Sequence, residues 1–211
     1  MRTAADFNQF YAAEHDPWHI SRARFRDKGL RRSISKFVIG KSVLELGCGE
    51  GHLTQSIFSE TRTVTGVDIS DIAIERAKAR NIQNARFENS DFLKISFDGY
   101  DVITAIECLY YLAPEEQEAF FEKVACERRG KPLILSGPII GSNEFRKYFT
   151  DQSLRKNVCP PRSVRDGVAQ SQRLPARRYG NSCSWFGQIA ALQLVAGLSA
   201  SRRNLPASLC R

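Results

Sequence analysis

The feature that most constrains this chain is a glycine-rich segment at residues 42–52, Ser-Val-Leu-Glu-Leu-Gly-Cys-Gly-Glu-Gly-His. Apolar residues around Glu45 predict a buried strand, which glycines at every second position then end. Glycine adopts left-handed backbone angles without steric cost and, having no Cβ, lets a ligand approach the main chain. The apolar spacing from His52 to Phe58 predicts a helix directly afterwards. A strand, a glycine loop and a helix in this order present free backbone N–H groups to a ligand.

The flanking sequence alternates between strand and helix patterns. Apolar runs predict further strands at 63–68, 85–88, 100–106 and 132–136. Helices are predicted at 6–14 and 21–38, after the cap residue Ser70, and from Pro114 onwards. This alternation indicates an α/β protein with a Rossmann-like, open, mostly parallel sheet and helices on both faces.

The composition changes after about residue 155. Residues 156–211 contain no glutamate, one lysine and eight arginines, and with the single acid Asp166 they account for the net charge of +8. The rest of the chain is neutral, which argues against a nucleic-acid partner. We therefore expect a domain at residues 1–155, with N-terminal helices at 4–38 as a cap, and an atypical basic segment at 156–211.

Several interpretations of the segment 156–211 stay open. Only Trp185 to Ala200 is periodic, with Ile189, Leu192, Ala196 and Leu198 roughly on one side. A disordered basic tail, a membrane-surface contact and a degenerate end all fit the composition. The break in lysine and glutamate usage is also what a shifted reading frame or a recombined tail would leave.

Cysteine and histidine spacing argues against a metal site. The six cysteines show no C-x-x-C pair, and none of the three histidines lies at ligand spacing from a cysteine. No apolar stretch reaches the length of a membrane span, and residues 1–6 lack the apolar region of a secretory signal. We therefore expect a cytoplasmic protein with free thiols.

Acidic residues follow three of the predicted strands: Asp68, Asp91 and Glu107. Parallel sheets bind ligands at the carboxyl ends of their strands, although a lone acid there is often only a helix cap. Asp68 is placed to accept hydrogen bonds from a ribose diol. The loop is G-x-G-x-G rather than the dinucleotide pattern, and the carboxylates of Glu45 and Glu50 would repel a pyrophosphate. They suit a cationic or zwitterionic ligand.

Four segments in order, 43–51, 66–70, 89–92 and 100–103, resemble the cofactor motifs of class I S-adenosylmethionine-dependent methyltransferases. The resemblance covers roughly residues 20–150. Asp16-Pro17-Trp18 and residues 107–112 further resemble the rhizobial nodulation protein S family of N-methyltransferases. That family is held to methylate the free amine of a de-N-acetylated chitooligosaccharide, at its non-reducing end, during nodulation-signal synthesis. The segment after residue 156 departs from the superfamily's final antiparallel hairpin.

The resemblance implies a cofactor role for particular residues. Gly47 and Gly49 would lie against the methionine part of the cofactor, Asp68 would bind the ribose, and Ile69 would pack on adenine. Asp91 and Phe92 would meet the adenine edge and Ile106 the sulfonium, while Trp18 and Arg24 would close the site. Trp18 would alternatively staple its own helix. The full implied set is Trp18, Arg24, Glu45, Gly47, Cys48, Gly49, Asp68, Ile69, Asp91, Phe92 and Ile106.

Three residues are candidates for the chemical step. Glu107 would act as the base that removes the proton of an amine. Tyr110, with Tyr111, would stack against a sugar or orient the amine, although one of the two could be core packing. His19 is a weaker base candidate. The expected substrate is an oligosaccharide, and the sequence indicates no oligomeric state.

Other functions remain open on this fold. A methyltransferase for another small-molecule acceptor and a noncatalytic nucleotide-binding module both fit the cofactor motifs. A nicotinamide-dependent reductase is disfavoured, because no tyrosine has a lysine four residues later. A nucleic-acid methyltransferase is disfavoured because Ile106-Glu107-Cys108-Leu109 lacks the Pro-Pro-aromatic motif used on flipped bases.

Overall fold

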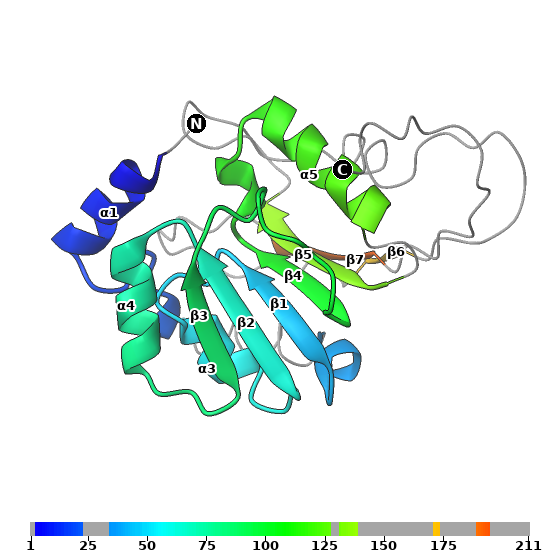
Figure 1. Ribbon diagram of the computed structural model, residues 1–211, viewed down its shortest axis with the longest axis horizontal. Helices are drawn as coiled ribbons and strands as arrows, with labels where there is room; N and C mark the ends of the chain where they lie inside the picture. Colours follow the sequence, from blue (N-terminus) through cyan, green and yellow to red (C-terminus); the bar gives the residue numbers. More distant parts are fainter. Residues whose placement is uncertain (1–2, 23–33, 128–130, 139–170, 174–188, 195–211) are drawn as a thin grey trace, which may run out of the picture.

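The computed structural model describes residues 3–22, 34–127, 131–138, 171–173 and 189–194. They form a seven-stranded sheet in the order β3-β2-β1-β4-β5-β7-β6 (Figure 1). The strands are β1 Ser42–Leu46, β2 Thr63–Asp68, β3 Ala85–Asn89, β4 Val102–Ile106, β5 Leu133–Pro138, β6 Ser171–Arg173 and β7 Ile189–Leu194. The helices are α1 Ala4–Ala13, η1 Ile20–Arg22, α3 His52–Ile57, α4 Asp71–Ala79, η2 Leu109–Tyr111 and α5 Pro114–Glu127.

The first five strands pair in parallel, as the sequence predicted. β1 lies in the centre between β2 and β4, so the strand order reverses there. The crevice at such a reversal is where open α/β sheets bind ligands. The only clear shift of a strand start is in β4, which begins at Val102 rather than at residue 100.

Helices cover both faces of the parallel sheet. On one face, Phe120 and Phe121 of α5 pack against Leu44 and Ile103. On the other, Ile57 of α3 and the helical turn at 34–38 pack against β1, β2 and β4, and α4 packs on Phe87 of β3. Central strands buried on both sides explain the nearly continuous apolar character of their sequences.

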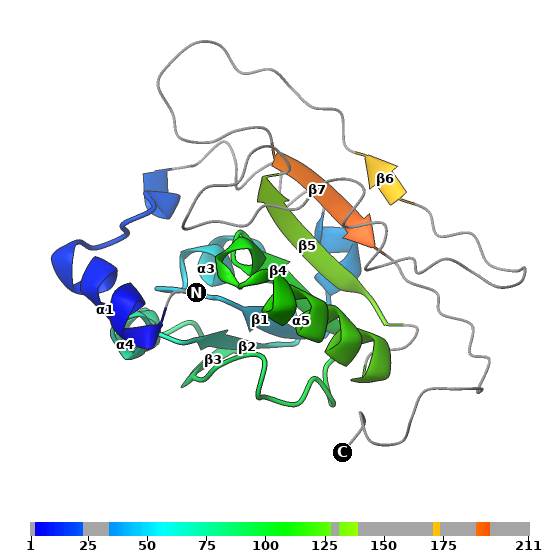
Figure 2. The ribbon, with the colours of Figure 1, turned by 90° about the horizontal axis from the view of Figure 1, so that it is seen from above.

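The N-terminal helix α1 lies beside α4 (Figures 1 and 2). Thr3 and Asp6 form a capping box that fixes its start. The Ser70 hydroxyl donates to the Asn8 side chain at 2.6 Å, which ties α1 to the N-terminus of α4. Of the predicted helix at 21–38, the structure describes only the two ends, the η1 residues and 34–38.

The far edge of the sheet corrects the interpretation of the C-terminal segment. β7 pairs antiparallel with β5, and β6 pairs antiparallel with β7 (Figure 2). The expected departure from a final antiparallel hairpin is therefore wrong. The described part of the periodic segment at 185–200 is a strand, because a short run of apolar and small residues fits either periodicity and the open edge of β5 selects the strand. The domain boundary at 155 stays a prediction.

Across the part of the chain that the structure describes, no helix has the length and apolarity that a membrane crossing requires.

Candidate functional site

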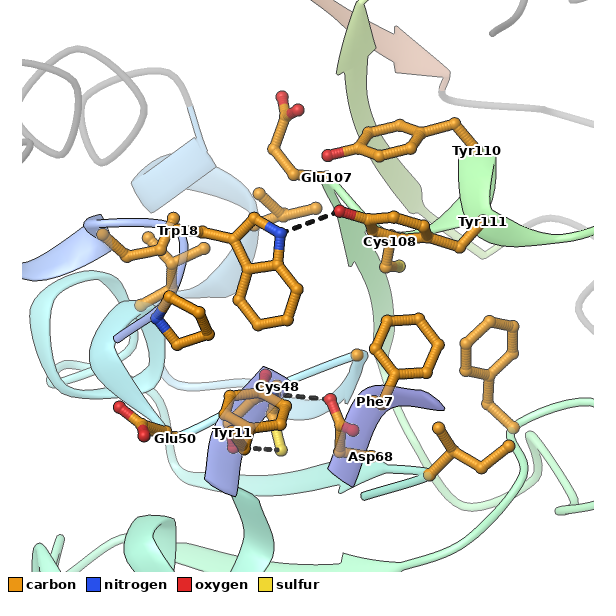
Figure 3. Close-up of a pocket in the computed structure, with 18 of the residues that line it drawn as sticks. Phe7, Tyr11, Trp18, Cys48, Glu50, Asp68, Glu107, Cys108, Tyr110 and Tyr111 are labelled. Atoms are coloured by element: carbon orange, nitrogen blue, oxygen red, sulfur yellow. Dashed lines mark hydrogen bonds between the residues drawn. The ribbon is translucent and has the colours of Figure 1, made fainter. Parts of the chain in front are cut away.

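A cavity of about 170 Å³ opens at the carboxyl ends of β1, β2 and β4, where the sheet order reverses. The N-terminal segment covers it from one side and η2 from the other (Figure 3). The lining residues are Phe7, Tyr11, Asp16, Pro17, Trp18, Ile20, Gly47, Cys48, Gly49, Glu50, His52, Leu53, Asp68, Ile69, Asp91, Phe92, Leu93, Ile106, Glu107, Cys108, Tyr110, Tyr111, Leu112 and Glu116.

The glycine loop between β1 and α3 forms the floor of the pocket. Gly47, Gly49 and Gly51 all have positive φ, between +52° and +76°. A Cβ at Gly47 would lie 2.6 Å from the Cβ of Cys108, and one at Gly49 would lie 2.7 Å from the Tyr11 hydroxyl. Both the backbone conformation and the close neighbours therefore require glycine at these positions.

Asp68 joins the glycine loop to the end of β2. Its Oδ2 accepts the Gly49 N–H at 2.9 Å and its Oδ1 accepts the Ser70 N–H at 3.0 Å. The side chain lies at the pocket wall but is mostly buried, and burial raises the pKa of the Asp68 carboxyl despite these bonds. The acid predicted to bind a ribose thus also fixes the loop geometry.

Glu45 does not reach the pocket, which corrects its predicted role as a cofactor contact. It points to the face of β1 that α3 covers, where the Thr54 hydroxyl donates to it at 2.5 Å. Burial raises the pKa of Glu45 to about 8, with the Thr54 bond acting in the opposite direction. The side chain is therefore largely uncharged at neutral pH, and it does not supply the negative charge expected of it.

Glu50 lines the pocket but is already paired. Arg76 donates to its Oε1 at 2.6 Å, and the backbone N–H of Asp16 donates to its Oε2 at 3.0 Å. His52 lies 3.1 Å from the same oxygen. Glu50 therefore fastens the N-terminal segment to the loop and to α4, rather than facing a ligand with an uncompensated charge.

Trp18 forms part of the wall above the loop. Its indole N–H donates to the Tyr111 hydroxyl at 2.9 Å, and its ring lies 5.1 Å from that of Tyr11 and 6.4 Å from that of Phe7 (Figure 3). Both interpretations of this residue from sequence are therefore compatible: Trp18 lines the site and also holds its segment down.

Glu107 and Tyr110 lie at the opposite end of the pocket from Asp68 (Figure 3). Glu107 directly follows β4 and has a φ of +56°. The Ser136 hydroxyl donates to Glu107 Oε1 at 2.7 Å. Tyr110 is buried, with its ring centroid 4.7 Å from that of Tyr111.

Four further predicted cofactor residues line the same cavity: Ile69, Asp91, Phe92 and Ile106. Asp91 is held by the Leu93 N–H at 3.0 Å and by an ion pair with Lys94 at 3.2 Å. The structure therefore brings these residues together, while their individual contacts with a ligand stay predictions.

Two predicted residues are not placed in the pocket. His19 is exposed and absent from the lining, although its neighbours Trp18 and Ile20 both line the cavity; it has a φ of +52°. The base role expected of it has no support in this position. Arg24 lies outside the described residues.

Sequence reasoning missed several lining residues: Phe7, Tyr11, Cys108, Leu112 and Glu116. Phe7 and Tyr11 are four residues apart on α1, so they indicated a buried helix face but not what it covers. Cys108 lies against Gly47, and burial raises the pKa of its thiol, as it does for Cys48. Both are free thiols, and the described residues contain no cluster of three or more metal-ligating side chains.

Carboxylates dominate the ionisable groups around the cavity. Asp16, Glu50, Asp68, Asp91, Glu107 and Glu116 line it. No lysine or arginine side chain among the described residues does so. Glu50 is paired with Arg76 and Asp91 with Lys94, so it is the other four carboxylates that favour a cation over an anion in this pocket.

Comparison with known proteins relates this chain to methyltransferases. Residues 43–126 match the family described as a methyltransferase domain. The nodulation protein S of Azorhizobium caulinodans is 30% identical over 107 residues, which are 48% of this chain and 52% of that protein. A ubiquinone biosynthesis O-methyltransferase of Nitrosomonas europaea is 32% identical over 80 residues, 34% of this chain and 33% of that protein. The chain thus spans about half, or less, of the length of these curated relatives.

Solved structures share the fold at low sequence identity. The N-methyltransferase NodS from Bradyrhizobium japonicum WM9, in complex with S-adenosyl-L-homocysteine, superposes with a TM-score of 0.68 at 19% identity, covering 92% of this chain and 99% of that chain. The magnesium protoporphyrin IX methyltransferase of Synechocystis PCC 6803 with bound S-adenosylmethionine gives 0.61 at 17% identity, covering 92% and 97%.

Proposed function

We propose that this protein, whose residues 43–126 form a methyltransferase domain of the class I S-adenosylmethionine-dependent family, transfers a methyl group to an amine. The finer proposal is that the acceptor is the free amine at the non-reducing end of a de-N-acetylated chitooligosaccharide, in nodulation-signal synthesis. Support for it comes from the partial similarity to nodulation protein S and from the charge of the pocket.

The residues at the loop end of the pocket fit S-adenosylmethionine. Asp68 Oδ2 accepts the Gly49 N–H and Oδ1 the Ser70 N–H, in the geometry of full hydrogen bonds. A carboxylate has about four acceptor sites, so acceptor capacity remains for a ribose hydroxyl. The glycines at 47 and 49 keep the floor free of side chains, and Ile69, Phe92 and Leu93 give an apolar wall for a flat base. When bound, the cofactor supplies a methyl carbon that a positive sulfur already activates.

The charge of the lining is the observation that carries the amine assignment. An acceptor amine is a cation in water, and the lining carboxylates attract it to the pocket. The same groups repel a phenolate or a carboxylate acceptor. This favours N-methylation over the O-methylation named for the ubiquinone-biosynthesis relatives.

The chain then has two tasks, positioning and deprotonation. Well-oriented reactants save about 7–11 kcal/mol of a bimolecular barrier. The amine must lose its proton before it attacks, and Glu107 is the carboxylate at the far end of the pocket that can accept it. A positioned base of this kind contributes roughly 10²–10⁴-fold.

A methyl-transfer assay with labelled S-adenosylmethionine tests the proposal. The acceptors are a de-N-acetylated chitooligosaccharide, the intact chitooligosaccharide, a catechol of the ubiquinone-precursor type and tRNA. We expect label only in the first. Label in the catechol would replace the amine assignment by O-methylation. Cofactor binding without transfer to any acceptor would favour a noncatalytic module.

A further inference from the structure

Glu107 has a backbone conformation that its own residue type disfavours. Its φ of +56° lies in the left-handed region, where a side chain with a Cβ crowds the following carbonyl. Such conformations persist where the surrounding structure imposes them, and they cluster at functional sites. The neighbours of Glu107 therefore identify what imposes it.

One residue of the adjacent strand β5, Ser136, forms hydrogen bonds with both the backbone and the side chain of Glu107. Ser136 on β5 is in register with Ile106, the last residue of β4. Its carbonyl oxygen accepts the Glu107 N–H at 2.9 Å, and its hydroxyl donates to Glu107 Oε1 at 2.7 Å. Ser136 is buried, so neither bond competes strongly with water.

The two bonds determine where the carboxylate lies. The backbone bond continues the β4–β5 ladder one residue past the strand, and the hydroxyl bond engages one carboxylate oxygen, Oε1. The second oxygen, Oε2, accepts no hydrogen bond from the described residues. Because Glu107 lines the cavity, this oxygen is available to a ligand proton there.

The next residue of β5 makes room for the neighbouring aromatic side chain. A Cβ at Gly137 would lie 3.4 Å from the Tyr110 ring, so the ring packs closely on the backbone of β5. Figure 3 shows the Tyr110 ring beside Glu107, with its hydroxyl end next to the Glu107 side chain. Two consecutive residues of β5 thus contact this end of the pocket: Ser136 holds Glu107, and Gly137 leaves room for Tyr110.

We propose that Ser136 is the positioning residue for the base Glu107: its hydroxyl holds one carboxylate oxygen so that the other faces the acceptor. The role rests on the proposed function, since it concerns the acceptor end of that site. Ser136 does not line the pocket and touches neither substrate nor cofactor in this assignment.

The test compares Ser136→Ala, Ser136→Thr, Glu107→Gln and the double variant Ser136→Ala/Glu107→Gln. We expect Ser136→Ala to lower kcat about tenfold, which is less than the roughly 10²–10⁴-fold contributed by a positioned base, because the base is still present but no longer held in place. KM and the affinity for S-adenosyl-L-homocysteine should stay unchanged. Ser136→Thr keeps the hydroxyl and should retain most of the activity. In the Glu107→Gln background, Ser136→Ala should cause no further loss, because both act through one carboxylate.

Thr104→Val is the matched control. Like Ser136, Thr104 carries a buried hydroxyl outside the pocket lining, but it lies on β4 and donates to the Leu44 carbonyl oxygen. Its kcat should stay within twofold of wild type. Thermal unfolding of each variant separates lost folding from lost chemistry. If Ser136→Ala does not fold, Ser136→Cys carries the test, because its thiol fills the same space but is only a weak donor to Glu107; it should lose activity as Ser136→Ala is expected to, and full activity would overturn the role.

Two results overturn the role of Ser136 alone: an active wild type with an equally active Ser136→Ala, or the same loss from Ser136→Ala in both backgrounds. A wild type that methylates none of the acceptors overturns the proposed function itself, and this role with it.

Discussion

Asp68 serves both the fold and the pocket. Its two oxygens accept the N–H groups of Gly49 and Ser70, which fixes the loop between β1 and α3 against the end of β2. The same carboxylate lies at the pocket wall. A single acid therefore couples the shape of the glycine loop to whatever hydroxyl groups a ligand offers.

Replacing Asp68 by Ala should weaken binding of S-adenosyl-L-homocysteine at least tenfold. The variant loses both the acceptors for a ligand and the anchor of the loop, and hydrogen bonds to a charged group contribute about 1.5–3 kcal/mol each. Titration calorimetry measures the affinity. Asp71→Ala, an exposed acid in the first turn of α4, is the control and should bind normally. Wild-type affinity in Asp68→Ala would refute the assignment.

Glu107→Gln should reduce turnover at least tenfold while the affinity for S-adenosyl-L-homocysteine stays within twofold. Glutamine keeps the size and can still accept the Ser136 hydroxyl, but it cannot take a proton from an amine. Initial rates with the amine acceptor check this. Glu118→Gln, an exposed residue of α5, controls for the loss of a charge. Undiminished turnover would remove Glu107 from the chemical step.

Glu45 should make the stability of the protein fall as pH rises. Its pKa is about 8 in the folded protein against an ordinary 4.5, mainly because of burial. Below pH 4.5 Glu45 is protonated in both the folded and the unfolded protein, so it costs the folded state no stability. Between pH 4.5 and 8 only the unfolded state releases the proton, so stability declines by up to about 1.4 kcal/mol per pH unit.

Denaturant unfolding at several pH values tests this expectation. Glu45→Gln keeps an acceptor for Thr54 and has no proton to lose, so its stability should rise relative to wild type between pH 5 and 8. A constant difference between the two proteins across that range would contradict the assignment.

At the scale of elements, the pocket is closed by segments distant in the sequence. α1 and the turn after it bring Phe7, Tyr11 and Trp18 over the ends of β1 and β2, and η2 brings Tyr111 from beyond β4. Glu50 holds the turn through the Asp16 N–H and α4 through Arg76. The wall therefore depends on three elements keeping their relative positions.

The Trp18–Tyr111 hydrogen bond should act as one unit in ligand binding. Trp18→Phe and Tyr111→Phe each remove it, and each should weaken S-adenosyl-L-homocysteine binding about fivefold, corresponding to about 1 kcal/mol for a lost bond. The double variant should be no weaker than the singles. Calorimetric affinities of the four proteins check this. If the loss of affinity in the double variant equals the product of the two single losses, Trp18 and Tyr111 contribute separately.

For the whole molecule, the last two strands complete the sheet. β7 pairs with β5 over six residues, from Leu133 to Pro138. β5 has buried apolar residues at 133–135, so without β7 it would be an exposed apolar edge. The basic segment is therefore more than an appendage, although its composition differs from that of the rest of the chain.

A chain ending at residue 155 should be less stable and more prone to aggregate than the full protein. We expect its midpoint of thermal unfolding to fall by about 5 °C or more, because the truncation exposes the backbone and one side of β5. Thermal unfolding followed by circular dichroism, with light scattering for aggregation, measures both effects. An unchanged midpoint would show that β6 and β7 contribute nothing to the fold.

Most of the parallel sheet could be predicted from the sequence. β2 was predicted with its exact bounds, and the Ser70 cap and the buried face of α4 at Ala73, Ile74 and Ala77 are confirmed. These features depend on residues within a few positions of one another, so local pattern reveals them. The convergence of Asp68, Asp91 and Glu107 also followed, because parallel strands end at one edge.

The sequence by itself therefore determined the strands, the glycine loop and the edge of the sheet at which the pocket opens, because periodicity, φ preference and strand direction are local properties. Only the tertiary structure decided which acids face the pocket. β1 is buried on both faces, so nothing in its pattern could place Glu45 under α3 rather than in the site. The pairing of β7 with β5 and of Ser136 with Glu107 likewise depends on which strands become neighbours, which contacts across many residues determine.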